Sequence, residues 1–219
     1  NLLGNPVKAI PVLEGMADMG IRWGSQTSLR FAENSDLLKL VARSGCIGLF
    51  VGIESVTGEY AHIPKLNGHH SQKELIKRVQ DAGIILEASF VFGFEDHDEG
   101  IFEKTARFIE DCKPSVPTFN VLTPYPGTEF FRQFDQQGRL LHKDWSRYNH
   151  SDVVFRPRLM TPEQLKRGWV MMRREAFSYG SILSRATQVP GRLLTNLAYN
   201  LLRRGPNRRL VLPEPGSYS

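Results

Sequence analysis

The 219-residue sequence is poor in cysteine and contains no long apolar run, and each absence excludes a class of protein. Cys46 and Cys112 are the only two cysteines, far apart and in unlike surroundings. This excludes a disulfide framework and a cysteine cluster with metal-binding spacing, and it is typical of a reducing compartment, so we predict a cytoplasmic protein. No apolar run reaches the roughly 18 residues that a transmembrane helix requires.

Acidic residues are scarce in the last part of the chain. Residues 156–219 hold 12 Lys and Arg against Glu163, Glu175 and Glu214, a net charge of +9, whereas residues 1–155 carry −4. A basic tail of this kind can contact anionic membrane or nucleic acid. A solvated helical face is the commoner reason for such charge, and we favour it here.

What is present is a set of apolar stretches that end on polar residues. In Gly48–Ser55, six apolar or glycine residues precede Glu54 and Ser55. Continuous apolar runs are typical of strands buried on both faces of a parallel sheet, whose ligands lie beyond the carboxyl ends of the strands. Glu54 is therefore a candidate site residue. A helix cap or a surface ion pair is the structural alternative.

Three further stretches repeat this pattern along the chain. We predict strands over residues 21–26, 84–94 and 119–123, each preceded by a helical segment. The first ends in Gly24-x-Gln26. The second is followed by the acidic residues 95–99, and the third is followed by a Pro-rich turn. Four helix–strand units predict an α/β fold with a parallel sheet, doubly wound or closed as a partial (β/α) TIM-like barrel.

The remaining segments are interpreted as loops and helices. We take the histidines and lysine of residues 56–71 (His62, Lys65, His69, His70) as solvated loop residues, and the acidic residues 95–99 as a turn and helix start. Thr161 is predicted to cap a helix that reaches about Tyr179. A final helix carries an apolar stripe of leucines from Leu193 to Leu202. The barrel, a missing domain and a membrane surface are its candidate partners, and we take packing as the default. We predict a barrel part over residues 1–137 and a helical extension with a loose basic tail over 138–219.

Several short motifs occur in a fixed order. They are WGSQ at residues 23–26, GCIGLFVGIES at 45–55, SFVFGF at 89–94, LTPYPGT at 122–128, DW at 144–145, VFRP at 154–157 and MTPE at 160–163. Together they resemble the C-terminal half of a radical S-adenosylmethionine (SAM) enzyme, of the group often fused to a cobalamin-binding domain. The resemblance covers about residues 1–180.

This resemblance implies a [4Fe–4S] cluster that cleaves SAM reductively, with cobalamin as a further cofactor of the group. It implies that Gln26, Glu54 and Ser55 face the ribose and amino-acid portion of SAM. Phe92, Gly93 and Phe94 would support the adenine through backbone contacts, with the two aromatic rings as walls of the pocket or as core. Leu122, Thr123 and Pro124 would close the adenine pocket.

The sequence also departs from this family. The CxxxCxxC motif that holds the cluster is absent, as is the glycine-rich segment that grips the methionine amino group. We therefore expect the chain to be part of a longer enzyme whose N-terminal half supplies the cluster, acting on an unknown substrate. The alternative is a non-catalytic remnant or binding module that uses its basic helical C-terminus on nucleic acid or anionic membrane.

Overall fold

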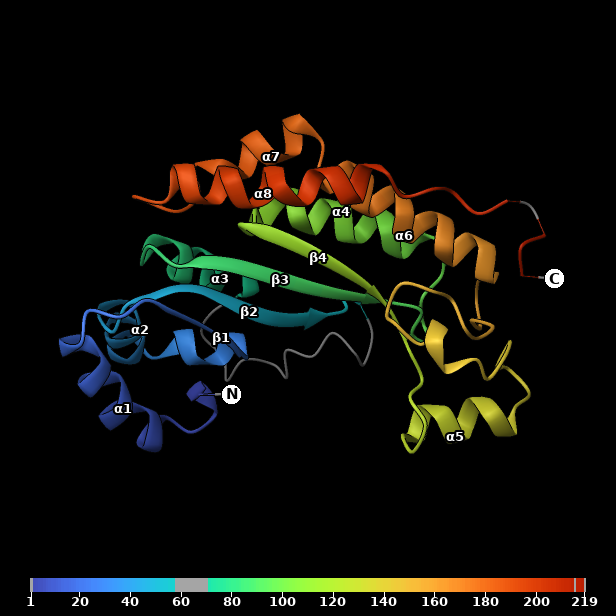
Figure 1. Ribbon diagram of the computed structural model, residues 1–219, viewed down its shortest axis with the longest axis horizontal. Coiled ribbons are helices and arrows are strands. Elements are labelled where there is room, and N and C mark those ends of the chain that lie inside the picture. Colours follow the sequence, from blue (N-terminus) through green and yellow to red (C-terminus); the bar gives the residue numbers. More distant parts are fainter. Residues whose placement is uncertain (1, 58–70, 215, 219) are drawn as a thin grey trace.

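The computed structural model describes residues 2–57, 71–214 and 216–218, and over these residues it contains one four-stranded parallel sheet (Figure 1). The strands are β1 (Trp23–Thr27), β2 (Cys46–Glu54), β3 (Ile85–Phe92) and β4 (Val116–Val121), and they lie in the order β1-β2-β3-β4. Sequential order with parallel pairing is the arrangement of a (β/α) barrel. The predicted fold, a partial TIM-like barrel followed by a helical extension, is confirmed.

Six of the eight described helices begin at a residue whose side chain caps them, the exceptions being α4 and α8. The described helices are α1 (Pro6–Asp18), α2 (Ser35–Arg43), α3 (Gln72–Asp81), α4 (Gly100–Cys112), α5 (Glu129–Gln136), α6 (Pro162–Ala176), α7 (Tyr179–Ala186) and α8 (Leu193–Arg208), with short 3-10 turns at Leu2–Gly4, Leu29–Glu33 and Trp145–Arg147. Ser71 with Glu74 and Thr161 with Gln164 form reciprocal capping boxes. The helix expected to reach Tyr179 instead ends at Ala176, because Ser178 caps a new helix, α7.

Strand β4 begins three residues before the predicted start. The extra residues include Pro117, which has no N–H to donate to a ladder. Pro117 is tolerated because β4 is an edge strand of the described sheet, paired with β3 alone. The predicted strand, which began at residue 119, did not include Pro117.

The two faces of the sheet have different chemistry. The outer face is apolar and packs against helices. On this face, Phe90 and Phe92 of β3 lie beside Phe108 and Phe102 of α4, respectively. The inner face carries polar residues that pair across strands. Thr118 donates to Glu87 over 2.6 Å, and Asn120 donates to Ser89 over 3.1 Å.

The C-terminal helices share the core of the sheet. The indole N–H of Trp169, a buried residue of α6, donates to the carbonyl oxygen of Phe119 in β4 over 2.9 Å. One continuous cluster of buried apolar residues extends from Leu3 to Val189. Figure 1 shows α4, α6, α7 and α8 together along the β4 side of the sheet. The division at residue 137 stays a prediction.

The orientation of α8 corrects one expectation. The leucine stripe does not pack: Leu194 and Leu202 are 79% and 77% exposed, whereas Asn196 and Asn200 are fully buried. The physical reason is the demand for hydrogen-bond donors on the covered side. Asn196 donates to the carbonyl oxygen of Arg185 over 3.1 Å, and Asn200 donates to that of Ser115 over 3.1 Å.

Candidate functional site

The carboxyl ends of the four strands lie along one edge of the sheet. In Figure 1 all four strands run toward α5 and the segment that follows it. The chain leaves β2 at Glu54, β3 at Phe92 and β4 at Val121, so the residues predicted from the sequence lie at or just beyond this edge. It is the edge at which parallel α/β proteins place ligands.

Glu54 has an unusual backbone conformation at the end of β2. Its φ is 64°, in the left-handed region that side chains rarely adopt, and the pairing register between β2 and β3 shifts between Gly52 and Glu54. The half-buried Glu54 side chain turns back over Gly52, where a Cβ would overlap its carboxylate. The space that the sequence pattern assigned to a ligand above Gly52 is therefore occupied by the Glu54 carboxylate itself. Strained backbone of this kind is concentrated at functional sites.

Ser55 is joined to a histidine that sequence reasoning missed as a site residue. The Ser55 hydroxyl and His97 Nε2 lie 2.8 Å apart, and both side chains are buried. The N–H of Gly93 donates to His97 Nδ1, so the ring proton is on Nε2 and is donated to Ser55. The Ser55 hydroxyl in turn donates to the Thr57 carbonyl oxygen over 2.8 Å. His97 thus ties the end of β2 to the end of β3.

The environment of His97 keeps its ring neutral. Burial lowers the pKa of His97 from 6.5 to about 4, an effect that the neighbouring carboxylates of Asp96 and Asp98 only partly oppose. The sequence offered one signal, the position of His97 within five residues of the end of a predicted strand. The surrounding acidic residues made that segment resemble an ordinary helix start.

The Phe92–Phe94 segment turns its side chains into the core. Phe92 lies 5.9 Å from Phe119 in a stacked pair, and Phe94 packs edge-on against His97. Gly93 has φ 107°, and a Cβ there would press on Phe155 and Leu165, 3.0 and 3.1 Å away. Backbone contact of this segment with an adenine stays a prediction.

The remaining predicted residues reach the edge to different extents. Leu122 and Pro124 are buried, and the N–H of Leu122 donates to the Phe92 carbonyl oxygen over 2.8 Å, which ties the ends of β3 and β4 together. Thr123 is half-buried and donates to the Val121 carbonyl oxygen. Gln26 is exposed and is paired with Phe50 rather than with Glu54, so it lies below the level of Glu54 on the sheet. The structure therefore joins the ends of β2, β3 and β4 and leaves Gln26 to one side.

The two cysteines do not fit an iron–sulfur cluster. Cys46 and Cys112 are buried, and burial raises the pKa of these thiols to about 12 and about 11. Cluster ligands are thiolates, several to a cluster, which these separate and protonated side chains cannot supply. Within residues 2–57 and 71–214, no group of three or more His, Cys, Asp or Glu side chains is placed to hold a metal ion. His62, His69 and His70 lie outside the described residues.

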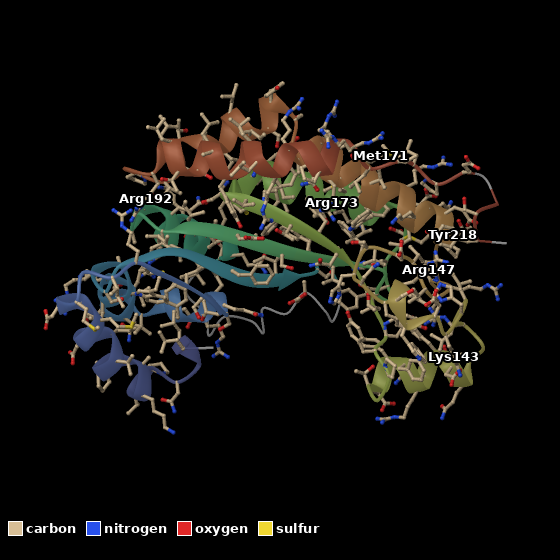
Figure 2. All side chains as sticks on the ribbon, in the orientation of Figure 1. Lys143, Arg147, Met171, Arg173, Arg192 and Tyr218 are labelled. Carbon is tan, nitrogen blue, oxygen red and sulfur yellow. The ribbon has the colours of Figure 1, made fainter. Side chains whose placement is uncertain are left out.

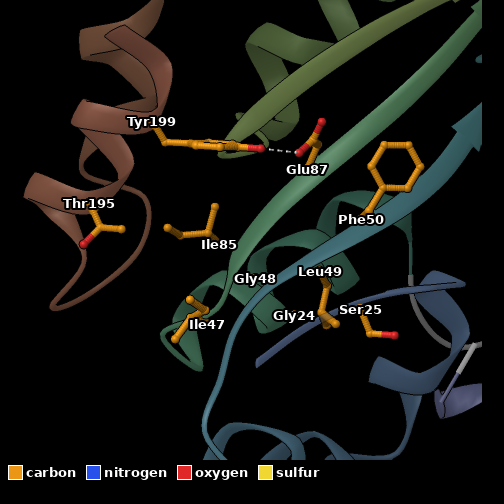
Figure 3. A pocket seen from close by; sticks show the side chains of 10 residues that line it. All are labelled: Gly24, Ser25, Ile47, Gly48, Leu49, Phe50, Ile85, Glu87, Thr195 and Tyr199. Carbon is orange, nitrogen blue, oxygen red and sulfur yellow. Dashed lines mark hydrogen bonds between the residues drawn. The ribbon is translucent and has the colours of Figure 1, made fainter. Parts of the chain in front are cut away.

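A separate cavity lies on the inner face of the sheet. It has a volume of about 440 Å³ and lies between the first halves of β1, β2 and β3 and the side chains of α8 (Figure 3). Tyr199 donates to Glu87 at its rim over 2.9 Å, and Arg203 pairs with the same carboxylate over 2.8 Å. The nine residues predicted for the site do not line this cavity. It is a feature distinct from the strand-end edge.

Fold and site together define a class of protein: an open (β/α) barrel with a carboxylate, an amide and a hydroxyl distributed along the carboxyl edge of its strands. The comparisons with known proteins place the chain more narrowly. No protein-family model matches it. The chain spans less than half the length of the curated relatives that it matches.

Two of these relatives are, by name, a methyltransferase and a cyclase. Bacteriochlorophyllide d C-12(1)-methyltransferase of Chlorobaculum tepidum is 29% identical over 192 residues, which are 87% of this chain and 42% of the relative. Anaerobic magnesium-protoporphyrin IX monomethyl ester cyclase of Cereibacter sphaeroides is 25% identical over 72% of this chain and 26% of the relative. Both relatives are enzymes.

A solved structure shares the fold. The radical SAM methyltransferase TsrM of Kitasatospora setae, with tryptophan and a SAM analogue bound, matches with a TM-score of 0.51 at 14% identity, over 95% of this chain and 43% of that chain. With the sequence relatives, this likeness confirms at partial coverage the resemblance to radical SAM enzymes that the ordered motifs indicated.

Proposed function

We propose that this chain is part of a radical SAM enzyme that modifies an unactivated carbon of its substrate, by methyl transfer or a related reaction. The observation that supports this most directly is the half-buried Glu54 carboxylate at the joined ends of β2, β3 and β4, held over Gly52 by a strained backbone. A carboxylate at this position suits the hydroxyls and the charged amino group of SAM.

In this proposal each residue of the edge has a distinct task. Glu54 and Gln26 contact the ribose and amino-acid portion of SAM, and Thr123 with Leu122 and Pro124 bounds the adenine. Phe92, Gly93 and Phe94 contribute backbone contacts, and His97 holds the β2 and β3 ends in register through Ser55 and Gly93. When bound, the cluster supplies the electron that cleaves SAM. Its ligands come from outside this chain, because Cys46 and Cys112 do not fit it.

The test is SAM affinity of the full-length polypeptide, reconstituted anaerobically, with and without Glu54→Ala. We expect the variant to lose about 1–3 kcal/mol of binding free energy, about 5- to 150-fold in Kd, because a charged hydrogen-bonding partner is removed. Glu103→Ala is the matched control, since Glu103 is an exposed glutamate on α4 that pairs with Arg107. Equal SAM affinity of the Glu54 variant and the wild type would remove Glu54 from the pocket and the main support of the proposal.

The alternative function is a non-catalytic module. It would bind neither SAM nor cobalamin in the full-length polypeptide, and the Glu54 substitution would then be silent in every assay. SAM binding by the reconstituted wild-type polypeptide, present in the enzyme and absent from the module, distinguishes the two candidates.

A further inference from the structure

We propose that the outer face of α7 and α8 docks on an anionic lipid bilayer. This face, the outer leucine face, consists of five exposed apolar side chains on two helices, with exposures between 41% and 79%: Tyr179, Leu183, Leu194, Leu201 and Leu202. Large apolar side chains that are grouped rather than scattered mark interaction surfaces. The proposal is independent of the proposed function, because it uses none of the strand-end residues.

These side chains form one continuous surface. Tyr179 and Leu183 are one turn apart on α7, and Leu194, Leu201 and Leu202 lie on one side of α8. The guanidinium of Arg204 on α8 lies 3.8 Å from the centroid of the Tyr179 ring, which brings the two helices' exposed faces together. Figure 2 shows side chains of α7 and α8 extending away from the sheet, along a rim where Met171 of α6 also lies.

The leucines cannot turn inward, because the opposite side of α8 is held by hydrogen bonds. Asn200 donates to Ser115 and accepts from the buried Arg185 guanidinium over 3.1 Å, and Arg203 pairs with Glu87. Rotating α8 to bury Leu194 and Leu202 would break these hydrogen bonds and this ion pair. The exposure of the leucines is therefore built into the packing.

The positive charge around the outer leucine face favours an anionic partner. Residues 176–213 contain no Asp or Glu and six arginines. Arg185, Arg192 and Arg203 bond to groups of the protein itself, and Arg204 lies over the Tyr179 ring. Arg208 and Arg209 are exposed at the end of α8. Arginine beside a leucine-rich helical face is the pattern of helices that lie in the interface of an anionic membrane. A second copy of this face would bring like charges together, and a nucleic acid would leave the leucines unburied.

In the described residues, no helix is long and apolar enough to cross a bilayer. The proposed contact is therefore with the surface of the bilayer, not across it. It would place α8 parallel to the bilayer, with the leucines among the acyl chains and the arginines at the phosphates.

The experiment is flotation of the full-length polypeptide with vesicles of phosphatidylcholine alone or mixed with an equal amount of phosphatidylglycerol, at physiological salt. We expect binding to the anionic vesicles, and we expect Leu194→Glu with Leu202→Glu to weaken it by about tenfold or more, since two charges would enter the acyl region. Arg208→Gln with Arg209→Gln should weaken binding and reduce its dependence on salt. Val7→Glu is the matched control, because Val7 on α1 is also 81% exposed.

Three outcomes would overturn the proposal. The first is failure of the full-length wild type to float with anionic vesicles. The second is binding that the leucine substitutions leave unchanged, which would make it purely electrostatic. The third is conversion by the leucine substitutions of a dimer into a monomer in analytical ultracentrifugation, which would make the occupant a second copy. Helical circular dichroism equal to that of the wild type shows that each variant is folded.

Discussion

At the scale of single residues, His97 is the side chain that most shapes the strand-end edge. Its ring accepts from the Gly93 N–H and donates to Ser55, so two strand ends depend on one neutral imidazole. A protonated ring would have two donors and would place a charge in a buried site. Protonation is therefore coupled to loss of this arrangement.

This coupling predicts how stability depends on pH. Because the pKa of His97 is lowered from 6.5 to about 4 in the folded protein, its contribution is complete above pH 6.5 and is lost as the pH falls toward 4. The loss amounts to about 3 kcal/mol over that interval. In His97→Gln this part of the pH dependence should vanish, so urea-unfolding curves of variant and wild type should converge as the pH is lowered from 6.5 to 4.

The control for this measurement is His150→Gln, at an exposed histidine that contacts Tyr125. Its curve should run parallel to that of the wild type. A His97 variant whose stability difference from the wild type stays constant across the interval would show that His97 does not titrate as inferred.

At the scale of elements, α8 shows that a helix's apolar stripe need not be its buried side. The sequence pattern places leucines on one side of α8 and amides on the other, and the structure buries the amides. The covered side of α8 faces the carbonyl oxygens of Ser115, Arg185 and Ala186, which need donors. Hydrogen-bond demand decided the orientation here because leaving buried acceptors unpaired costs more than leaving leucines in water.

Because α8 buries its asparagines and exposes its leucines, we expect substitution of a buried asparagine to destabilise the protein more than substitution of an exposed leucine. Asn200→Ala should lower the free energy of unfolding by about 1–3 kcal/mol, because it removes the buried hydrogen bonds that the Asn200 amide makes with the Ser115 carbonyl and the Arg185 guanidinium. Leu202→Ala should change it by less than about 0.5 kcal/mol, because Leu202 is 77% exposed. Urea unfolding of both variants checks the ranking. A larger loss for Leu202→Ala would mean that the leucine face is covered within the folded polypeptide.

At the scale of the whole molecule, the helical extension and the barrel meet at a contact that only glycine permits. Gly168 of α6 lies against Phe102 of α4, and a Cβ at residue 168 would overlap the Phe102 ring. Phe102 in turn lies 4.9 Å from Phe92 of β3, measured between ring centroids. One line of contacts thus connects the extension to the strand that carries the candidate site.

Gly168→Ala should therefore destabilise the protein, although alanine is the better helix former. We expect a loss of about 1–3 kcal/mol from overpacking. Gly205→Ala is the control, since nothing lies within 4 Å of its added Cβ in α8, and it should be neutral or stabilising by up to about 1 kcal/mol. Thermal unfolding followed by circular dichroism measures both. Equal stability of the Gly168 variant and the wild type would show that the α4–α6 contact is looser than the structure indicates.

Much of the architecture was predictable from the sequence because it depends on local patterns. Continuous apolar runs indicated the parallel strands, and the Ser71–Glu74 pair and the cap Thr161 marked helix starts. The residues of the strand-end edge were predictable because strand ends are sequence-local features. Their chemistry was not, since the backbone at Glu54 and the tie through His97 depend on residues that meet only in three dimensions.

The sequence by itself determined the succession of parallel strands, the basic character of the last third and the ordered motifs that resemble those of radical SAM enzymes. Tertiary structure alone decided which side of α8 is buried, where the Glu54 carboxylate lies and what His97 holds. This difference between what sequence and tertiary structure decide has one physical cause. Periodicity records how apolar a side chain is, whereas the partners of buried polar groups are set by segments distant in the chain, such as Ser115 and Asn200, and appear only when the chain is folded.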